Sequence, residues 1–253
     1  MDRLIYTAVS GMNASMVRQR MIASNMANAQ TIGFRAEILE ATPMTVDGPS
    51  LEVRAMSHAA VRGASMKEGA LTQTGRELDI AMQGDVMLGI QALDGSEAYT
   101  RRGDLAVTAT GVMQTGDGYP VIGENGPVTV PLGAHVSIAP DGAVMVADPA
   151  VPEEPPQKID RLKLASFAGS KIEKGLDGQF RVAGGGVGVG GGVLPVDEDA
   201  RVMTGALEQS NVVPSQVLVE MVEAQRLFDI RTKLVSTARE LDEGGARLMR
   251  ISG

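Results

Sequence analysis

The residues that could catalyse a reaction or bind a metal do not have the neighbours or spacing that such chemistry requires. The chain of 253 residues has no cysteine, which excludes thiol catalysis and cysteine-based zinc sites. Its two histidines, His58 and His135, lie far apart and outside any nucleophile motif. Glu153 and Glu154 are adjacent in a proline-rich segment, whereas acid and base catalysis needs two carboxyl groups in different environments. We therefore expect no enzyme, no metal site and no cofactor.

The glycine-rich segment 184–192 could suggest a phosphate-binding loop. Such loops continue into Gly-Lys-Ser/Thr between a strand and a helix, and this segment does not. We interpret it as a flexible loop. The net charge of −8 also argues against a nucleic-acid partner, because binding to phosphates requires clustered lysine and arginine.

The first 30 residues predict a long amphipathic helix. Between Asp2 and Gln30 there is no proline and one glycine. Apolar residues recur there with alternating steps of four and three, the spacing of a coiled-coil seam, with Gln19 as its one polar member. The assembly interface predicted on this helix consists of Ile5, Val9, Met12, Met16, Ala23 and Met26.

A second long helix is predicted near the C-terminus. Ser210 and Asn211 are suitable caps, and Pro214 suits the first helical turn. The apolar residues that follow form two adjoining stripes, which are too wide for a two-stranded coil and require more than one neighbour. The interface predicted on this helix consists of Val217, Met221, Ala224, Leu227, Phe228, Ile230, Leu234, Leu241 and Leu248.

Between the helices the sequence predicts antiparallel strands. Short apolar segments alternate with Asp94-Gly95, Asp117-Gly118 and Asp141-Gly142, which favour tight hairpin turns. We expect an α+β fold in which the two terminal helices form an antiparallel coiled-coil-like base for a central antiparallel β domain. The expected parts are an N-terminal helix and motif (1–35), an extended or β connecting segment (36–75), a central β domain with Pro- and Gly-rich loops (76–205) and a C-terminal helix (206–253).

Three segments resemble the flagellar rod and hook protein family. Ser24 to Arg35 resembles the segment after the N-terminal helix, residues 78–123 the β domain, and residues 205–228 the start of the C-terminal helix. In the first segment, Asn25 and Asn28 can bond local backbone, Gly33 allows a turn, and Phe34 can anchor the chain; these four are the family-motif residues. Within the family, the opening residues and compact length resemble the proximal-rod member; the distal-rod protein FlgG is the alternative.

The resemblance implies a structural subunit of the proximal rod that polymerises through its terminal helices and transmits torque. It implies partners among copies of itself, the rod proteins FlgB, FlgC, FlgG and FliE, the surrounding ring proteins and the flagellar type III export apparatus. It further implies a place in the basal body, spanning the periplasm, and export without a cleaved signal peptide. Neither nucleic-acid binding nor membrane insertion is expected, since no apolar run approaches the roughly 20 residues of a membrane helix.

Two readings outside the family stay open at this point. A coiled-coil surface assembly protein would share the helices but would not need the three segments in this order. An enzyme acting on cell-wall glycan would need two carboxylates converging in a cleft.

Overall fold

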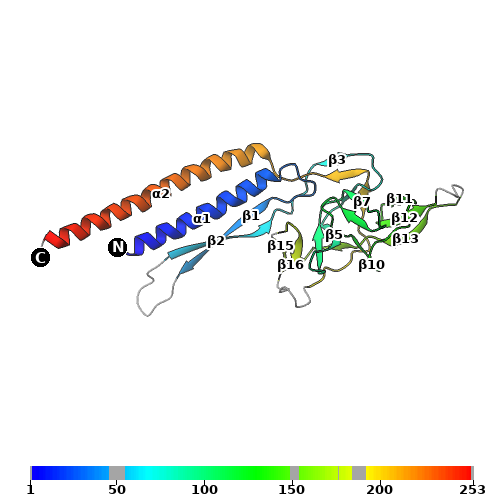
Figure 1. The fold of residues 1–253 in the computed structure, drawn as a ribbon, viewed down its shortest axis with the longest axis horizontal. Helices are drawn as coiled ribbons and strands as arrows, with labels where there is room; N and C mark the ends of the chain where they lie inside the picture. The colour runs from blue at the N-terminus through cyan, green and yellow to red at the C-terminus, as the bar shows by residue number, and fades with distance from the viewer. Residues whose placement is uncertain (1, 46–54, 149–153, 176, 184–191, 252–253) are drawn as a thin grey trace. The chain divides into compact units, whose positions relative to one another are not determined.

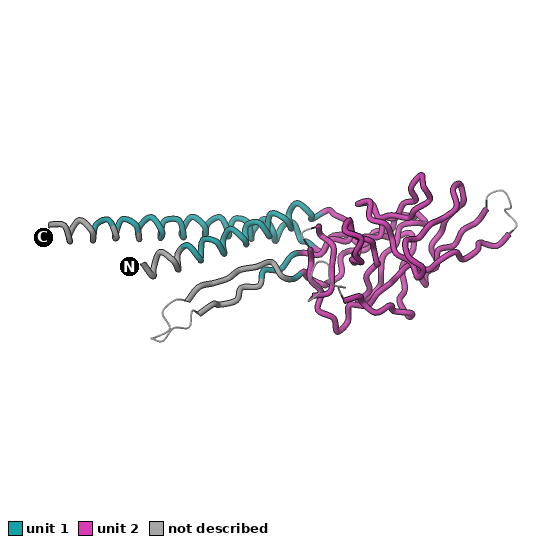
Figure 2. Tube along the Cα trace, turned by 60° about the horizontal axis from the view of Figure 1, so that its bottom comes forward, with its two compact units in different colours: residues 1–29, 37–63, 212–253 teal, residues 30–36, 64–211 magenta. Residues whose placement is uncertain are grey.

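The computed structural model describes residues 2–45, 55–148, 154–175, 177–183 and 192–251, and within these it has a helix at each end and strands between them (Figure 1). Most of the predicted glycine-rich loop (184–192) and Glu153 lie outside the described residues. The chain forms two compact units (Figure 2). The helical unit comprises residues 1–29, 37–63 and 212–253, and the β unit comprises residues 30–36 and 64–211.

The helical unit contains α1 (Asp2–Ala27), α2 (Pro214–Ile251) and a hairpin of β1 (Glu37–Thr45) and β2 (Ala55–Ala64). The two helices lie side by side and run in opposite directions (Figures 1 and 2). α1 begins and ends close to where its capping and turn residues predict, and α2 begins at the predicted Pro214. α2 then continues past Gly244, the first helix breaker in its sequence, as far as Ile251. No helix among the described residues is long and apolar enough to cross a lipid bilayer.

The predicted coiled-coil-like base is wrong. A coiled coil buries an apolar seam along its whole length, but Val9 and Met16 of the predicted α1 seam are exposed, and Ser15 and Ile22, each one residue before a predicted position, are buried. Arg231 of α2 reaches across α1, where its guanidinium donates to the carbonyl of Gly11 and to the hydroxyl of Ser15. A polar contact between the helices thus stands where a coiled coil would have a packed apolar side chain.

The β unit consists of short strands in small sheets. The largest has five strands in the order β14-β5-β6-β16-β15, one has the order β11-β12-β13, and the others are pairs. The recorded pairings within it are antiparallel. The strands are β3 (Leu71–Gln73), β4 (Ile80–Met82), β5 (Val86–Gln91), β6 (Glu97–Thr100), β7 (Leu105–Val107), β8 (Met113–Thr115), β9 (Ile122–Gly123), β10 (Gly126–Pro127), β11 (His135–Ile138), β12 (Ala143–Ala147), β13 (Gln157–Arg161), β14 (Leu164–Ser166), β15 (Ile172–Lys174), β16 (Phe180–Val182), β17 (Val202–Thr204) and β18 (Ala206–Glu208).

The three predicted Asp-Gly turns are present. Gly95, Gly118 and Gly142 have φ angles of 79°, 85° and 82°, which glycine adopts readily. Gly95 joins β5 to β6, and Gly142 joins β11 to β12. The frequent turns explain why the strands are short.

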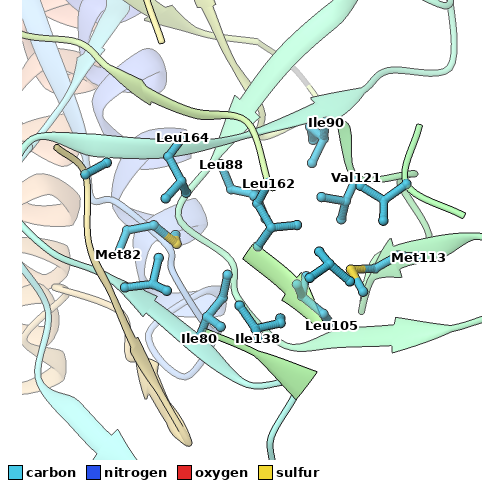
Figure 3. Close-up of a cluster of buried hydrophobic side chains, with 14 of the residues drawn as sticks. Ile80, Met82, Leu88, Ile90, Leu105, Met113, Val121, Ile138, Leu162 and Leu164 are labelled. Atoms are coloured by element: carbon cyan, nitrogen blue, oxygen red, sulfur yellow. The ribbon is translucent and has the colours of Figure 1, made fainter. Parts of the chain in front are cut away.

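One large apolar cluster joins most of the small sheets of the β unit. Figure 3 shows Met82, Leu88, Leu105, Ile138 and Leu162 converging from different strands and the segments between them. Each is at most 5% exposed. Since pairs of short strands are unstable alone, this shared core is what allows them to form one unit.

Candidate functional site at the junction of three segments

The two ends of the β unit's chain are bonded to each other. Segment 30–36 enters the unit beside residues 206–211, so that Gly33 N–H donates to the carbonyl of Glu208 at 2.8 Å, and Asn211 N–H donates to that of Phe34 at 3.2 Å. The end of the N-terminal motif and the start of the C-terminal segment therefore form one local structure, although they are far apart in sequence.

A buried ionic cluster lies at this junction. Glu208, the last residue of β18, accepts from two arginines: Arg35 Nη2 lies 2.7 Å from Oε1, and Arg101 Nη2 lies 2.6 Å from Oε2. The three side chains are only 1–2% exposed. One carboxylate thus neutralises one of two buried guanidinium groups.

Backbone groups provide further hydrogen bonds to the cluster. Arg101 donates to the carbonyls of Gly84 and Val86, each at 2.6 Å, and of Met82 at 3.0 Å. Glu208 Oε1 also accepts from Gly69 N–H at 2.8 Å. These bonds offset part of the cost of removing the charges from water.

Arg35 is the less well compensated arginine. Its Nη1 donates to the Lys67 carbonyl, while its buried Nε has no hydrogen-bond partner among the described residues. Burial lowers the pKa of Arg35, and the neighbouring Arg101 charge lowers it further, whereas Glu208 raises it. The guanidinium remains charged at neutral pH, because arginine titrates far above it.

Gly33 brings the backbone of the motif against Arg101. Its φ of +68° favours glycine, and a Cβ at this position would lie 2.5 Å from the Arg101 carbonyl carbon and oxygen. No other residue would fit without moving the backbone that carries the arginine. Phe34 follows, with Lys174 Nζ 3.5 Å above its ring centroid.

Asn211 fastens three segments of the β unit through one side chain. Its Oδ1 accepts from Ala36 N–H at 2.7 Å, and its Nδ2 donates to the carbonyls of Ser65 at 2.9 Å and Lys67 at 2.8 Å. A side-chain amide suits this position because it offers an acceptor and two donors together. The predicted capping role understates what this residue does.

Replacing Asn211 with alanine should lower the free energy of unfolding by about 2–4 kcal/mol, because three hydrogen bonds contribute about 1 kcal/mol each. Asn211→Asp should also destabilise, because a carboxylate cannot donate to the two carbonyls. Denaturant unfolding of the full chain would measure both. Equal stability of wild type and Asn211→Asp would contradict the role assigned to the amide.

The other motif residues lie in the helical unit. Asn25 bonds Glu37 in both directions, donating to its carbonyl at 3.1 Å and accepting from its N–H at 2.8 Å. Asn28 donates to the Ser24 carbonyl at 2.9 Å, one turn back. Asn25 therefore fixes the start of β1 against the end of α1.

The structure places the predicted interface residues on different faces of the helices. Val217 and Ala224 are buried, and Met12, Met26, Met221 and Phe228 are half-buried. The side chains of Ile5, Leu241 and Leu248 lie outside the described residues. The exposed members are Val9, Met16, Ala23, Leu227, Ile230 and Leu234.

Sequence reasoning missed two sets of residues. Leu218, Val219 and Val222 add to the exposed apolar side chains of α2, and of the three only Val219 has a helical spacing that puts it close to the face of Ile230. Arg101 and Glu208 lie in the segments that carry the family resemblance, but nothing in their local pattern signals burial. Their pairing depends on contacts between residues 107 positions apart.

Carboxylates do not converge in a catalytic arrangement at the described depressions. One depression of about 360 Å³ is lined by Asp148 and Glu154, both exposed to solvent. Glycosidic chemistry needs one carboxyl whose pKa is raised by a desolvated environment, and exposure to solvent does not provide one. Among the described residues, no three acidic or histidine side chains are grouped to hold a metal ion.

Comparisons with known proteins match the same three parts of the chain. Residues 5–35 match the family described as flagella basal body rod protein, residues 81–146 the flagellar hook protein FlgE/F/G D1 domain, and residues 203–248 the flagellar basal body rod FlgEFG protein C-terminal. Each matched part contributes one member of the ionic cluster, namely Arg35, Arg101 and Glu208.

Individual relatives cover the whole chain. It is 39% identical to the flagellar basal-body rod protein FlgF of Salmonella typhimurium over 100% of both chains, and 40% identical to that of Escherichia coli over 94% of both. The FlgG protein of Bacillus subtilis is 30% identical over 95% of this chain and 97% of its own. Because the identity extends from end to end and is higher for FlgF than for FlgG in these comparisons, the chain belongs to the FlgF family of flagellar basal-body rod proteins.

Proposed function

We propose that the chain is a structural subunit of the proximal part of the flagellar basal-body rod, where it polymerises through its terminal helices and transmits torque. The relatives are named as basal-body rod proteins, which supports a place for this chain in the rod. The observation that carries polymerisation is the outward apolar surface of α2. This surface consists of Leu218, Val219, Val222, Leu227, Ile230 and Leu234.

Exposed apolar side chains of this kind favour binding to a partner, because binding removes them from water. Several large apolar side chains exposed on one helix indicate a protein interaction site, and each large aliphatic side chain contributes about 1.5–3 kcal/mol when it is fully buried. In this proposal neighbouring rod subunits cover the surface. A structural role, rather than catalysis, fits an arrangement of this kind.

The junction supports a route for torque. The chain passes between the two units after residues 29, 36, 63 and 211. Within the β unit, Ala36, Ser65 and Asn211 lie next to three of these passages and are bonded to one another, directly or through the Asn211 side chain. We infer that a mechanical load on one of these segments is shared with the other two. No single segment would then be pulled out of the β unit on its own.

Location and partners follow from the same proposal. The subunit would lie in the basal body with its copies and with FlgB, FlgC, FlgG and FliE, inside the surrounding ring proteins. It would span the periplasm after export through the flagellar type III apparatus without a cleaved signal peptide. Co-purification of the assembled rod with the tagged subunit is the direct measurement of these neighbours.

Replacing Val222 and Ile230 together with aspartate should abolish motility and incorporation into basal bodies, because two charges would have to be buried at the contact without partners. The purified variant should unfold like the wild type, since both side chains are exposed in the single chain. Swimming, and immunoblots of isolated basal bodies from a strain carrying only the variant, would measure this.

The matched control is Ser236→Asp, Thr237→Asp, which adds the same two charges to exposed polar positions of α2. It should leave motility nearly unchanged. Normal swimming of the Val222→Asp, Ile230→Asp variant would refute polymerisation through this surface.

A further inference from the structure

The exposed residues of α1 form one stripe along the helix. From residue 9 to residue 27, each exposed residue lies on it, and successive members are four or three positions apart, the spacing of one helix face. The α1 stripe consists of Val9, Asn13, Met16, Arg20, Ala23 and Ala27. Val9 and Met16 are 44% and 40% exposed. In the single chain α1 therefore has an uncovered face that is largely apolar and carries one cation.

A second stripe on α2 has the same spacing in the opposite direction. The α2 stripe consists of Glu223, Leu227, Ile230 and Leu234, all exposed to solvent. From Leu234 down to Glu223 the steps are four, three and four residues, as they are from Val9 up to Arg20. Two antiparallel helices can therefore set these four members of each stripe opposite one another, because both helices rise by the same distance per residue.

One antiparallel register brings the unpaired charges of the two stripes together. Neither Arg20 nor Glu223 has an ion-pair or hydrogen-bond partner among the described residues. When Arg20 is placed opposite Glu223, apolar residues also face each other, namely Met16 and Leu227, and Val9 and Leu234. The stripes are thus complementary in both charge and apolar character in the same register.

The charges near this pair favour an α2 partner for Arg20. From residue 9 to residue 27, α1 has two arginines and no acidic residue, so a second α1 cannot supply a carboxylate there. On α2, Glu220 and Arg226 lie one turn to either side of Glu223 and are turned about 60° around the helix in opposite directions. Their charges offset each other, and Glu223 is the charge that faces the α1 stripe.

The two stripes of one chain cannot meet each other. Within the chain, α1 faces α2 through Gly11 and Ser15, which accept from Arg231, and Ser15 is buried whereas the stripes are exposed. This contact sets position 13 of α1 level with Arg231. In the register described above, Asn13 is level with Ile230, so an α1 from a second copy would lie at nearly the same height as the chain's own α1.

We propose that the α1 stripe of one copy packs antiparallel against the α2 stripe of a second copy, with Arg20 paired to Glu223. The proposal rests on the proposed function, for which it names the element that covers part of the exposed apolar surface of α2. The two stripes are different surfaces, so a row of bound copies has one free stripe of each kind at its ends. Such head-to-tail contacts build rings or helical polymers.

Disulfide cross-linking of the full chain tests the register, because the chain has no cysteine of its own. Asn13 and Ile230 would face each other across the contact but point outward within one chain, so an N13C, I230C chain should form disulfides between copies. Mild oxidation should then give a ladder of dimers, trimers and larger products. The control N13C, S236C moves the second thiol to another exposed face of α2. We expect about tenfold more product larger than a dimer with I230C than with S236C, because the contact raises the local thiol concentration.

Charge reversal gives a second readout that does not depend on a disulfide. R20E and E223R should each reduce incorporation into basal bodies about tenfold in strains that carry only the variant, because like charges would face each other. A chain with both changes should recover most of the incorporation, since the pair is restored with its signs exchanged. Immunoblots of isolated basal bodies would measure this.

The matched control is D229R, which reverses an exposed carboxylate of α2 outside the stripe and should incorporate like the wild type. The purified R20E and E223R variants should unfold like the wild type, because neither side chain has a partner among the described residues of the single chain. A loss of incorporation would then reflect the contact between copies and not the stability of the subunit.

Two results would overturn this contact. Ladders of equal yield from the I230C and S236C chains would exclude the register. An R20E, E223R chain that incorporates no better than the single variants would exclude the pairing of Arg20 with Glu223, and this is the result expected if a different rod protein covers the α2 stripe. Either result would leave the rod function intact as long as the Val222→Asp, Ile230→Asp variant fails to swim.

Discussion

Replacing Glu208 with glutamine is expected to destabilise the β unit by about 3–5 kcal/mol, the cost of breaking a buried ion pair. Glutamine keeps the size of the side chain but leaves the Arg35 and Arg101 guanidinium groups buried without a countercharge. Arg101 would retain its carbonyl partners, so Arg35, whose Nε has no partner, should be affected most. Denaturant unfolding of the full chain, followed by circular dichroism, would measure the loss.

Glu77→Gln is the matched control for Glu208→Gln. Glu77 also contacts a basic side chain, with its Oε2 2.8 Å from His135 Nε2, but both side chains are more than half exposed. Exposed pairs contribute about 0–1 kcal/mol. If the two variants unfold at the same denaturant concentration, the buried cluster does not stabilise the junction. Should Glu208→Gln fail to fold, Glu208→Asp, which keeps the charge but shortens the reach, should give an intermediate and measurable loss.

The second large effect is expected for Gly33→Ala. Two costs combine at this position: a positive φ costs an L-residue about 1–2 kcal/mol, and the new methyl group would lie 2.5 Å from backbone atoms of Arg101. Relief of that contact would displace the residue that binds Glu208. We expect a total loss of about 3 kcal/mol or more, measured as a lower unfolding midpoint.

Gly118→Ala separates the two costs. Gly118 has a φ of +85°, but nothing lies within 4 Å of a Cβ built there. Its substitution should therefore cost only the backbone preference, about 1–2 kcal/mol. A Gly33→Ala variant no less stable than Gly118→Ala would show that the close approach to Arg101 does not matter.

The expected effects at Glu208 and Gly33 concern the same small region. The cluster joins one residue from each of the three parts that match the flagellar families. None of these parts can satisfy the buried charge of another unless all three are folded together. We therefore expect variants of the cluster to lower motility through loss of folded subunit rather than through loss of a contact between subunits.

Local patterns predicted the elements well but not their faces. Proline, capping residues and apolar spacing located α1 and α2, and the Asp-Gly pairs located the hairpin turns. The apolar spacing on α1, however, pointed to Met16 and Ala23 when Ser15 and Ile22 are buried. Hydrophobicity alone could not reveal that the Arg231 guanidinium would bond Gly11 and Ser15 and so select the neighbouring face.

The sequence by itself determined the helix positions, the turns and the family, because each of these depends on residue types and spacings within short stretches of the chain. Only the tertiary structure decided that Arg35, Arg101 and Glu208 meet in the buried interior, that Asn211 bonds three segments, and that many large aliphatic residues of α2 are exposed to solvent. The physical reason is that burial and charge pairing depend on which distant segments the folded chain brings into contact. Neither the composition of one segment nor its periodicity contains that information.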